Sequence, residues 1–105
     1  MKECTPEEFA TAHAAGAVVI DVREPQEYTA GHVPRAILRP LSQIGSRVHD
    51  IPADGPVYVI CASGNRSKAV TDLLINAGRE AYSVRGGTMG WSRAGRPLVT
   101  GTSPE

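Results

Sequence analysis

Cysteine is scarce in this chain of 105 residues: only Cys4 and Cys61 occur, and they do not form a C-x-x-C pair. So few cysteines exclude a disulfide framework and indicate reduced thiols, as in the cytoplasm. Together with three histidines, they match no spacing typical of metal ligands. We therefore expect a cytoplasmic protein that has no metal and no cofactor.

Net charge and long apolar runs are also lacking. Lys+Arg and Asp+Glu both number 11, so the formal net charge is zero and gives no support to a nucleic-acid or anionic-membrane partner. No apolar run approaches the roughly 18 residues of a membrane span, and no basic region followed by an apolar stretch opens the chain. The length fits one domain, which we place at residues 1–100, with a flexible tail at 101–105.

Apolar runs alternate with helix signals along the chain. The runs that predict strands are 18–20, 36–38, 57–60 and 81–84. The helices are expected at 6–15 and 24–30, after the Cys61 loop, and after Gly86-Gly87, and residues 41–48 form an amphipathic segment. In the helix after the loop, the residues expected to face the core are Val70, Leu73, Leu74 and Ala77, with Gly78 as the C-cap. This alternation predicts an α/β fold with a mostly parallel central sheet and helices on both faces.

The segment Cys61-Ala62-Ser63-Gly64-Asn65-Arg66-Ser67 lies between a predicted strand and a predicted helix. At such a turn, backbone N–H groups and the positive end of the helix dipole favour a thiolate, the reactive form of cysteine. Gly64 allows the backbone to curl so that N–H groups point inward. We expect Ser67 to cap the helix and Arg66 to supply a positive charge, or else to pair with a structural carboxylate.

Three strands direct chemically useful residues to one edge of the predicted sheet. In open α/β sheets, ligands bind beyond the carboxyl ends of the strands. Asp21 and Arg23, the segment 61–67, and Gly86 with Gly87 all follow strands and are expected to meet there. We interpret Asp21 as an acceptor that holds loop N–H groups. Arg23 is equally consistent with an ion pair or an anion-facing role, and the two glycines with a turn or a binding loop.

Other residues have plainer interpretations. We expect Cys4 to pack near the first helix, with a resolving thiol as the alternative. His32 is expected to satisfy a loop hydrogen bond, and Trp91 to lie in the core.

Several ordered pieces of the chain resemble the rhodanese (sulfurtransferase) domains, over about residues 4–99. These pieces are Asp21-Val22-Arg23-Glu24 with Glu27-Tyr28, Gly31-His32-Val33-Pro34 with Ala36, Cys61-x-Ser63-Gly64-Asn65-Arg66-Ser67, and Gly86-Gly87 with Trp91 and Gly95-x-Pro97. The resemblance implies a single-domain rhodanese-like fold.

The resemblance also implies a two-step reaction on Cys61. The thiolate would take the outer sulfur of thiosulfate or a similar donor and pass it from a persulfide to cyanide or a thiol. Arg66 would form a fork onto the sulfonate oxygens of the donor. The partners would be a small-molecule donor and acceptor. The alternative is a delivery or interaction module that a sulfur-relay protein loads, with little thiosulfate turnover.

Related phosphatases and arsenate reductases use a loop one residue longer, usually with histidine before the cysteine. Here four residues separate Cys61 from Arg66, and Ile60 precedes the cysteine, which disfavours phosphatase chemistry. The chain also departs from the common rhodanese pattern at Arg35, Leu38, Arg39 and Ala62. Ala62 stands where many members carry arginine, so the loop has one positive group fewer.

Overall fold

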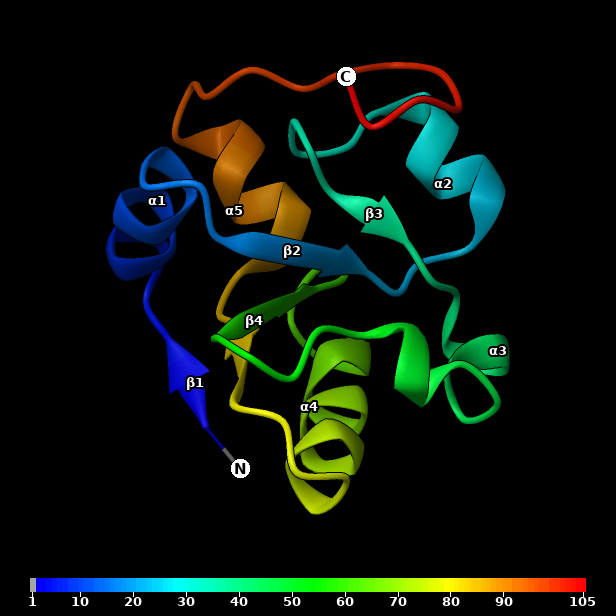
Figure 1. Ribbon diagram of the computed structural model, residues 1–105. Coiled ribbons are helices and arrows are strands. Elements are labelled where there is room, and N and C mark those ends of the chain that lie inside the picture. Colours follow the sequence, from blue (N-terminus) through cyan, green and yellow to red (C-terminus); the bar gives the residue numbers. More distant parts are fainter. Residues whose placement is uncertain (1) are drawn as a thin grey trace.

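The computed structural model describes residues 2–105 and contains one five-stranded sheet in the order β1-β5-β4-β2-β3 (Figure 1). All four neighbouring pairs are parallel. The strands are β1 (Glu3–Cys4), β2 (Val18–Asp21), β3 (Ile37–Leu38), β4 (Val57–Ile60) and β5 (Ala81–Val84). The predicted mostly parallel sheet is therefore confirmed.

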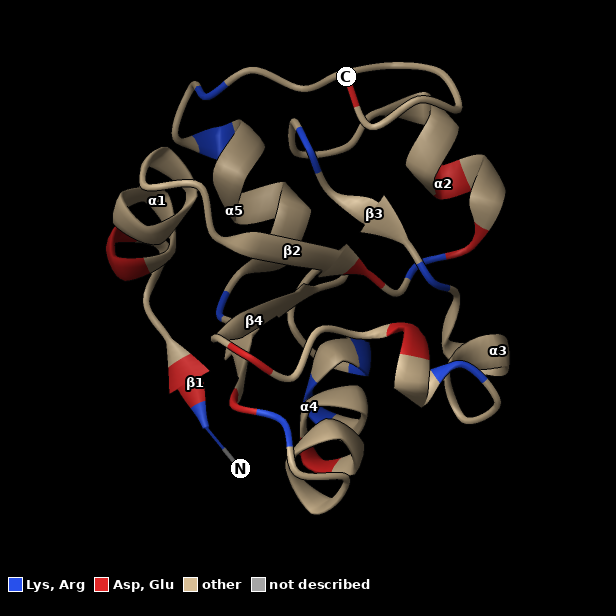
Figure 2. Cartoon of the chain, in the orientation of Figure 1, with Lys and Arg blue, Asp and Glu red and all other residues tan. Residues whose placement is uncertain are grey.

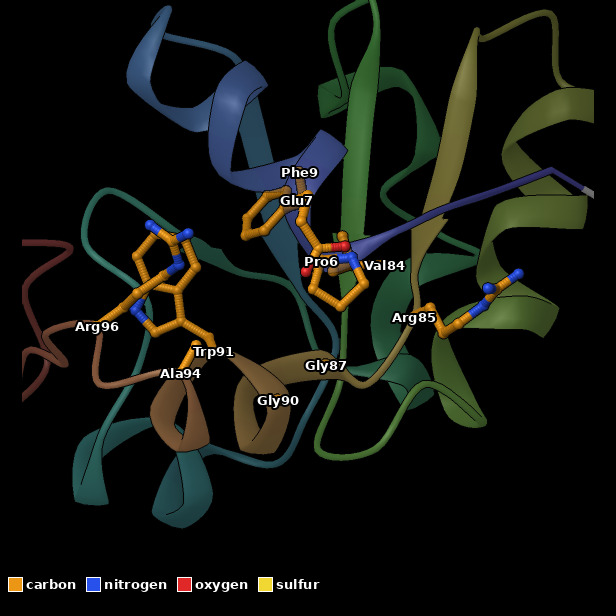
Figure 3. Close-up of a pocket in the computed structure, with 10 residues that line it drawn as sticks. All are labelled: Pro6, Glu7, Phe9, Val84, Arg85, Gly87, Gly90, Trp91, Ala94 and Arg96. Atoms are coloured by element: carbon orange, nitrogen blue, oxygen red, sulfur yellow. The ribbon is translucent and has the colours of Figure 1, made fainter.

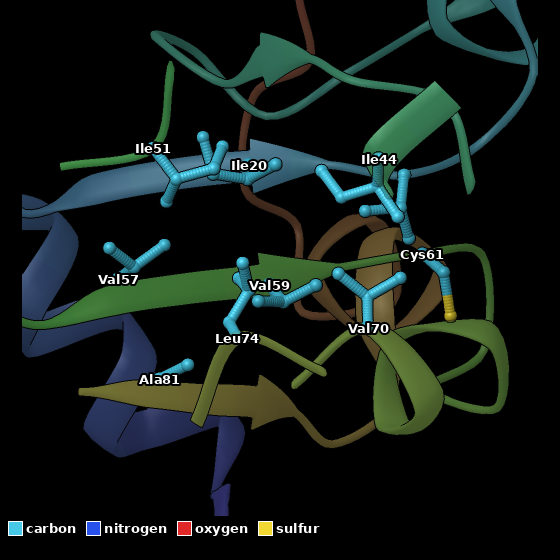
Figure 4. Packing of buried hydrophobic residues seen from close by; sticks show 10 residues of the cluster. Ile20, Ile44, Ile51, Val57, Val59, Cys61, Val70, Leu74 and Ala81 are labelled. Atoms are coloured by element: carbon cyan, nitrogen blue, oxygen red, sulfur yellow. The ribbon is translucent and has the colours of Figure 1, made fainter. Parts of the chain in front are cut away.

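Helices cover both faces of this sheet. They are α1 (Pro6–Ala14), α2 (Pro25–Ala30), α3 (Leu41–Ile44), the 3-10 helix η1 (Val48–Asp50), α4 (Arg66–Asn76) and α5 (Gly87–Arg93). On one face, Phe9 of α1, Tyr28 of α2 and Trp91 of α5 share a core cluster. On the other face, Ile44 of α3 and Leu74 of α4 pack against the sheet (Figure 4). Burial of these apolar side chains on both faces is the main favourable contribution to folding.

Capping residues begin the first two helices as their sequence indicates. Thr5 and Glu8 form a reciprocal capping box at the start of α1, with Thr5 Oγ1 accepting from Glu8 N at 3.1 Å. Glu24 and Glu27 form a second box at α2, which ends at Gly31. Basic and acidic residues alternate around the fold without a block of one sign (Figure 2).

The structure corrects several predicted elements. Strand β1 was not predicted, because its two residues are too short to show a pattern. The amphipathic segment 41–48 is divided between two elements: α3 ends at Ile44 and η1 begins at Val48. In α4, Leu73 is 37% exposed and Ala77 is an exposed C-cap. The buried stripe of α4 consists instead of Ser67, Val70, Thr71 and Leu74. Hydroxyl groups enter this stripe because buried partners satisfy them.

The C-terminal segment 101–105 lies against α2 and the loop after it. Gly101 N donates to Thr29 O at 2.9 Å, and Arg35 N donates to Pro104 O at 2.9 Å. A ring nitrogen of His32 lies 2.9 Å from Ser103 O. Flexibility of this tail stays a prediction. No helix within residues 2–105 is long and apolar enough to cross a membrane.

Candidate active site at the Cys61 loop

The start of α5 fastens the cysteine loop to the sheet edge. Thr88 N donates to Cys61 O at 2.8 Å and Met89 N donates to Ala62 O at 3.0 Å. Gly87 permits this approach, because a Cβ there would lie 2.3 Å from Cys61 O, and its φ is +55°. Gly86 and Gly87 therefore form the turn that brings α5 onto the loop, as one of the two interpretations predicted.

The Cys61 thiol lies inside the curve of the loop, where backbone and hydroxyl groups surround it. Gly64 N donates to Sγ at 3.0 Å, and the hydroxyl of Ser67 lies 3.4 Å from Sγ. The side chain is only 1% exposed, and its sulfur points toward the segment that leads into α4 (Figure 4). Gly64 has φ +105° and packs closely on the turn after β5, so this backbone shape requires glycine.

These hydrogen bonds decide the acidity of the thiol. Burial raises the pKa of Cys61, but hydrogen bonds from Ser67, Gly64 and Ser63 lower it by more, so the net shift is downward. A buried thiol would otherwise resist ionisation. The loop therefore favours a thiolate in a site that excludes most water.

Ser67 does not cap the helix, contrary to the sequence-based expectation. Asn65 occupies the N-cap position of α4 without a side-chain capping bond, and Ser67 lies in the first turn with its hydroxyl directed at the sulfur. A second hydroxyl, of Ser83 on β5, lies 2.7 Å from that of Ser67. Sequence analysis missed Ser83; its signal was a serine on the buried face of a strand that otherwise consists of hydrophobic residues.

The guanidinium of Arg66 forms a two-pronged ion pair with Glu27 of α2. The distances are 2.7 Å from Nη1 to Oε1 and 2.8 Å from Nη2 to Oε2. Hydrogen bonding to Arg66 lowers the pKa of Glu27 to about 2. The structure thus shows the structural pairing that was the alternative for Arg66, and its role toward a donor sulfonate stays a prediction.

Asp21 and Arg23 form a second, fully buried pair at the end of β2. Arg23 Nη2 donates to Asp21 Oδ2 and to Gly31 O, both at 2.8 Å. Asp21 Oδ1 also accepts from Arg23 N at 3.0 Å, as predicted for a loop-holding carboxylate. For Arg23 the structure therefore supports the ion-pair interpretation. Ser63 and Asn65 are exposed at the rim of the loop, and Ala62 is half-buried beside it.

Two hollows lie near this edge of the sheet. The larger, of about 340 Å³, adjoins Ala62 and is lined in part by Met89, Arg93 and Leu98. The smaller, of about 30 Å³, lies between α1 and α5, where Arg96 covers the Trp91 ring (Figure 3). That volume holds about one water molecule, so of these two hollows the one beside Ala62 has room for a substrate.

Among residues 2–105, no group of three His, Cys, Asp or Glu side chains is arranged to hold a metal ion. The other predicted residues have structural partners. His32 is fully buried, with Nδ1 2.8 Å from Tyr28 O, which agrees with its predicted loop hydrogen bond.

Comparison with known proteins agrees with this geometry. The profile of the family described as "Rhodanese-like domain" matches residues 5–94. The chain is 41% identical over 92 residues to the uncharacterized protein YqhL of Bacillus subtilis strain 168, covering 87% of this chain and 72% of that protein. It is 34% identical over 91 residues to the thiosulfate sulfurtransferase GlpE of Pseudomonas entomophila strain L48, covering 86% and 84% of the two chains. A crystal structure of a rhodanese-related protein from Thermoplasma volcanium superposes with a TM-score of 0.90 at 31% identity, covering 96% of this chain and all of that one.

Proposed function

The chain belongs to the rhodanese-like domain family, and from this premise we propose that it is a sulfurtransferase that carries a sulfane sulfur on Cys61. The observation that supports this most directly is the thiol held between Gly64 N and the Ser67 hydroxyl. Both groups stabilise negative charge on sulfur without a metal ligand or a neighbouring base. The loop is therefore suited to a reaction in which sulfur is both nucleophile and carrier.

In the first step, the Cys61 thiolate attacks the outer sulfur of thiosulfate. A sulfur–sulfur bond forms on Cys61, the sulfur–sulfur bond of thiosulfate breaks, and sulfite leaves with the electron pair. The product is a Cys61 persulfide anion. The N–H of Gly64 and the hydroxyl of Ser67 hold the attacking sulfur in place, and the exclusion of water by the buried loop protects the persulfide.

In the second step, cyanide or the thiolate of an acceptor attacks the outer sulfur of the persulfide. The bond to Cys61 breaks, and Cys61 leaves as the thiolate that began the cycle. The low affinity of the loop thiolate for a proton makes it a good leaving group. The carbon frame of a thiol acceptor fits the hollow beside Ala62, where Met89 and Leu98 supply apolar contact.

A second candidate function is a delivery module that a partner protein loads with sulfur. It is favoured by one observation: both arginines expected near the donor are already paired, Arg66 with Glu27 and Arg23 with Asp21. A dianionic donor would have to compete with these carboxylates. A protein donor, which presents its persulfide directly, needs no such cation.

The experiment that tests the main proposal is intact-protein mass spectrometry after treatment with thiosulfate. The parent chain and the Cys4→Ser variant should each gain one sulfur atom that cyanide removes, and Cys61→Ser should gain none. Cys4→Ser is the matched control, because it also removes a buried thiol.

Sulfur uptake by Cys61→Ser would overturn Cys61 as the carrier. A folded parent chain that gains no sulfur from thiosulfate would contradict thiosulfate as the donor. Incubation with a cysteine desulfurase then tests the second candidate: loading of Cys61 would support it, and failure to load would contradict it.

A further inference from the structure

Three buried side chains from different parts of the fold form a chain of hydrogen bonds that ends at the reactive sulfur. Cys61 Sγ lies 3.4 Å from Ser67 Oγ, which lies 2.7 Å from Ser83 Oγ. Ser67 and Ser83 are 0% exposed and Cys61 is 1% exposed. These side chains are shielded from bulk solvent, and buried hydroxyl groups are nearly always hydrogen-bonded, so the links between them matter.

The strand register explains why Ser83 reaches this position. Ser83 pairs with Val59 in the parallel β4–β5 ladder, and Cys61 follows Val59 by two residues. Side chains two residues apart on a strand point to the same face, so Ser83, Val59 and Cys61 lie on the side covered by α4. The first turn of α4 then places Ser67 between the hydroxyl of Ser83 and the sulfur.

The hydroxyl of Ser83 has one hydrogen-bond partner in the part of the chain that the structure describes, and this determines what Ser83 can do. Among residues 2–105 the only partner of its hydroxyl is Ser67 Oγ, and the carbonyl of Ser67 is already occupied by Thr71 Oγ1 at 2.7 Å. In the neutral thiol, Cys61 Sγ donates to Ser67 Oγ. In the thiolate the sulfur can only accept, so the hydrogen of Ser67 is directed to the sulfur when Ser83 donates to Ser67. When Ser67 instead donates to Ser83, the hydrogen of Ser83 is buried without an acceptor, which is unfavourable.

We propose that Ser83 is a positioning residue that acts through Ser67 to favour the thiolate form of Cys61. Donation from Ser83 orients the Ser67 hydroxyl as a donor to sulfur and polarises it, which strengthens its bond to the negative charge. Without Ser83, the Ser67 hydroxyl is free to turn toward backbone carbonyls three or four residues before it in the chain. The role rests on the proposed function, in which this thiolate is the nucleophile.

Charged groups do not replace this relay, because within residues 2–105 none of them forms a hydrogen bond with Cys61 Sγ or with the hydroxyls of Ser67 and Ser83. Arg93, which lines the hollow beside Ala62, forms no ion pair within these residues, and the other cations near the loop are paired.

Arg66 at the start of α4 pairs with Glu27 of α2, and Arg23 pairs with Asp21 at the end of β2. Glu3 of β1 forms ion pairs with two cations. Arg85 Nη2 lies 3.6 Å from Glu3 Oε1, and Lys68 Nζ lies 3.9 Å from Glu3 Oε2.

The test is the pH profile of Cys61 alkylation by iodoacetamide, which requires no sulfur donor or acceptor. Ser83→Ala should move the profile to higher pH and slow alkylation at neutral pH about two- to fivefold. Ser83→Thr, which restores a hydroxyl, should recover most of the rate. In a Ser67→Ala background, Ser83→Ala should have no further effect, because the link to sulfur is already absent.

Thr71→Val is the matched control: it removes a buried hydroxyl of α4 that bonds the Ser67 carbonyl and not its side chain. It should leave the profile in place. An unchanged profile in Ser83→Ala, or an equal shift in the Ser67→Ala background, would overturn the relay. A shifted profile in a chain that takes up no sulfur would support the relay and contradict the proposed function.

Discussion

Cys4 ends strand β1 and Cys61 directly follows the parallel strand β4, and the two residues are 5% and 1% exposed. Their acidities nevertheless shift in opposite directions. The pKa of Cys4 is raised from 9.0 to about 11, mainly by burial and to a smaller extent by the carboxylate of Glu8. For Cys61, burial also raises the pKa, but donors from the loop reverse the shift.

The difference shows that burial alone produces an unreactive thiol. Cys4 packs against apolar residues of the α1 side, including Phe9 and Val84. Cys61 is no more exposed, but Gly64 N and the Ser67 hydroxyl are directed at its sulfur. Directed donors, and not solvent access, thus separate a packing cysteine from a candidate nucleophile.

The largest expected effect is the ratio of alkylation rates of the two cysteines in the native chain at neutral pH. Thiolate fraction changes tenfold per pKa unit, so Cys61 should react about 100-fold faster than Cys4 or more. Peptide mapping by mass spectrometry after a short iodoacetamide pulse measures the ratio. In urea the ratio should fall toward one. Similar alkylation rates in the native chain would contradict the predicted difference in acidity between the two thiols.

Gly64→Ala should lower the reactivity of Cys61 toward that of Cys4. Alanine at φ +105° is strained, and its Cβ would lie 3.3 Å from Gly86 N, so the loop must shift and its N–H leave the sulfur. We expect neutral-pH alkylation of Cys61 to slow about tenfold. Gly78→Ala is the control, because its φ is +88° in open space away from the thiol. A loss of the same size in Gly78→Ala would attribute the effect to general strain.

The charges near the two thiols also differ: a paired cation, Arg66, lies near Cys61, and carboxylates lie near Cys4. Glu27→Gln tests the ion pair of Arg66. The pKa of Glu27 is lowered from 4.5 to about 2 by Arg66, so the pair stabilises the fold above the ordinary pKa. That stabilisation is lost as pH falls through about 2. Because the pair is about one-third exposed, we expect about 1 kcal/mol.

Urea unfolding of the parent chain and Glu27→Gln at neutral and acidic pH measures this contribution. The stability difference should shrink as the pH approaches 2. Glu7→Gln, which changes an exposed carboxylate of α1, should show no comparable pH dependence. A difference between parent and Glu27→Gln that stays constant with pH would contradict the assigned pairing.

The smallest effect is expected from Glu8→Gln. It removes a charge that raises the pKa of Cys4, so that pKa should fall slightly, while burial keeps it above that of Cys61. The weaker capping box should destabilise the fold by about 0.5 kcal/mol. The pH profile of Cys4 alkylation checks the first point and thermal unfolding the second. A Cys4 that becomes as reactive as Cys61 would mean that charge, not burial, protects it.

Local patterns were sufficient for much of the fold. Apolar runs located β2, β4 and β5, and Thr5, Pro6 and Glu8 located the start of α1. Patterns failed where an element was short, as in β1, or where hydroxyls replaced apolar residues on a buried face, as in α4. Strand β1 is stabilised by β5, far away in the sequence, and the hydroxyl of Ser67 meets that of Ser83, 16 residues away.

The sequence alone determined that Cys61 follows a strand, and that a turn with a glycine then leads from it into a helix. It did so because strand and helix patterns are local. The alternation of strands and helices placed this turn at the carboxyl edge of a parallel sheet. Only the tertiary structure decided how the charges and hydroxyls there are shared. Arg66 is bound to Glu27, 39 residues away, and Ser67 meets Ser83, 16 residues away. Such pairings depend on strand register and helix placement, which arise from the packing of the whole chain.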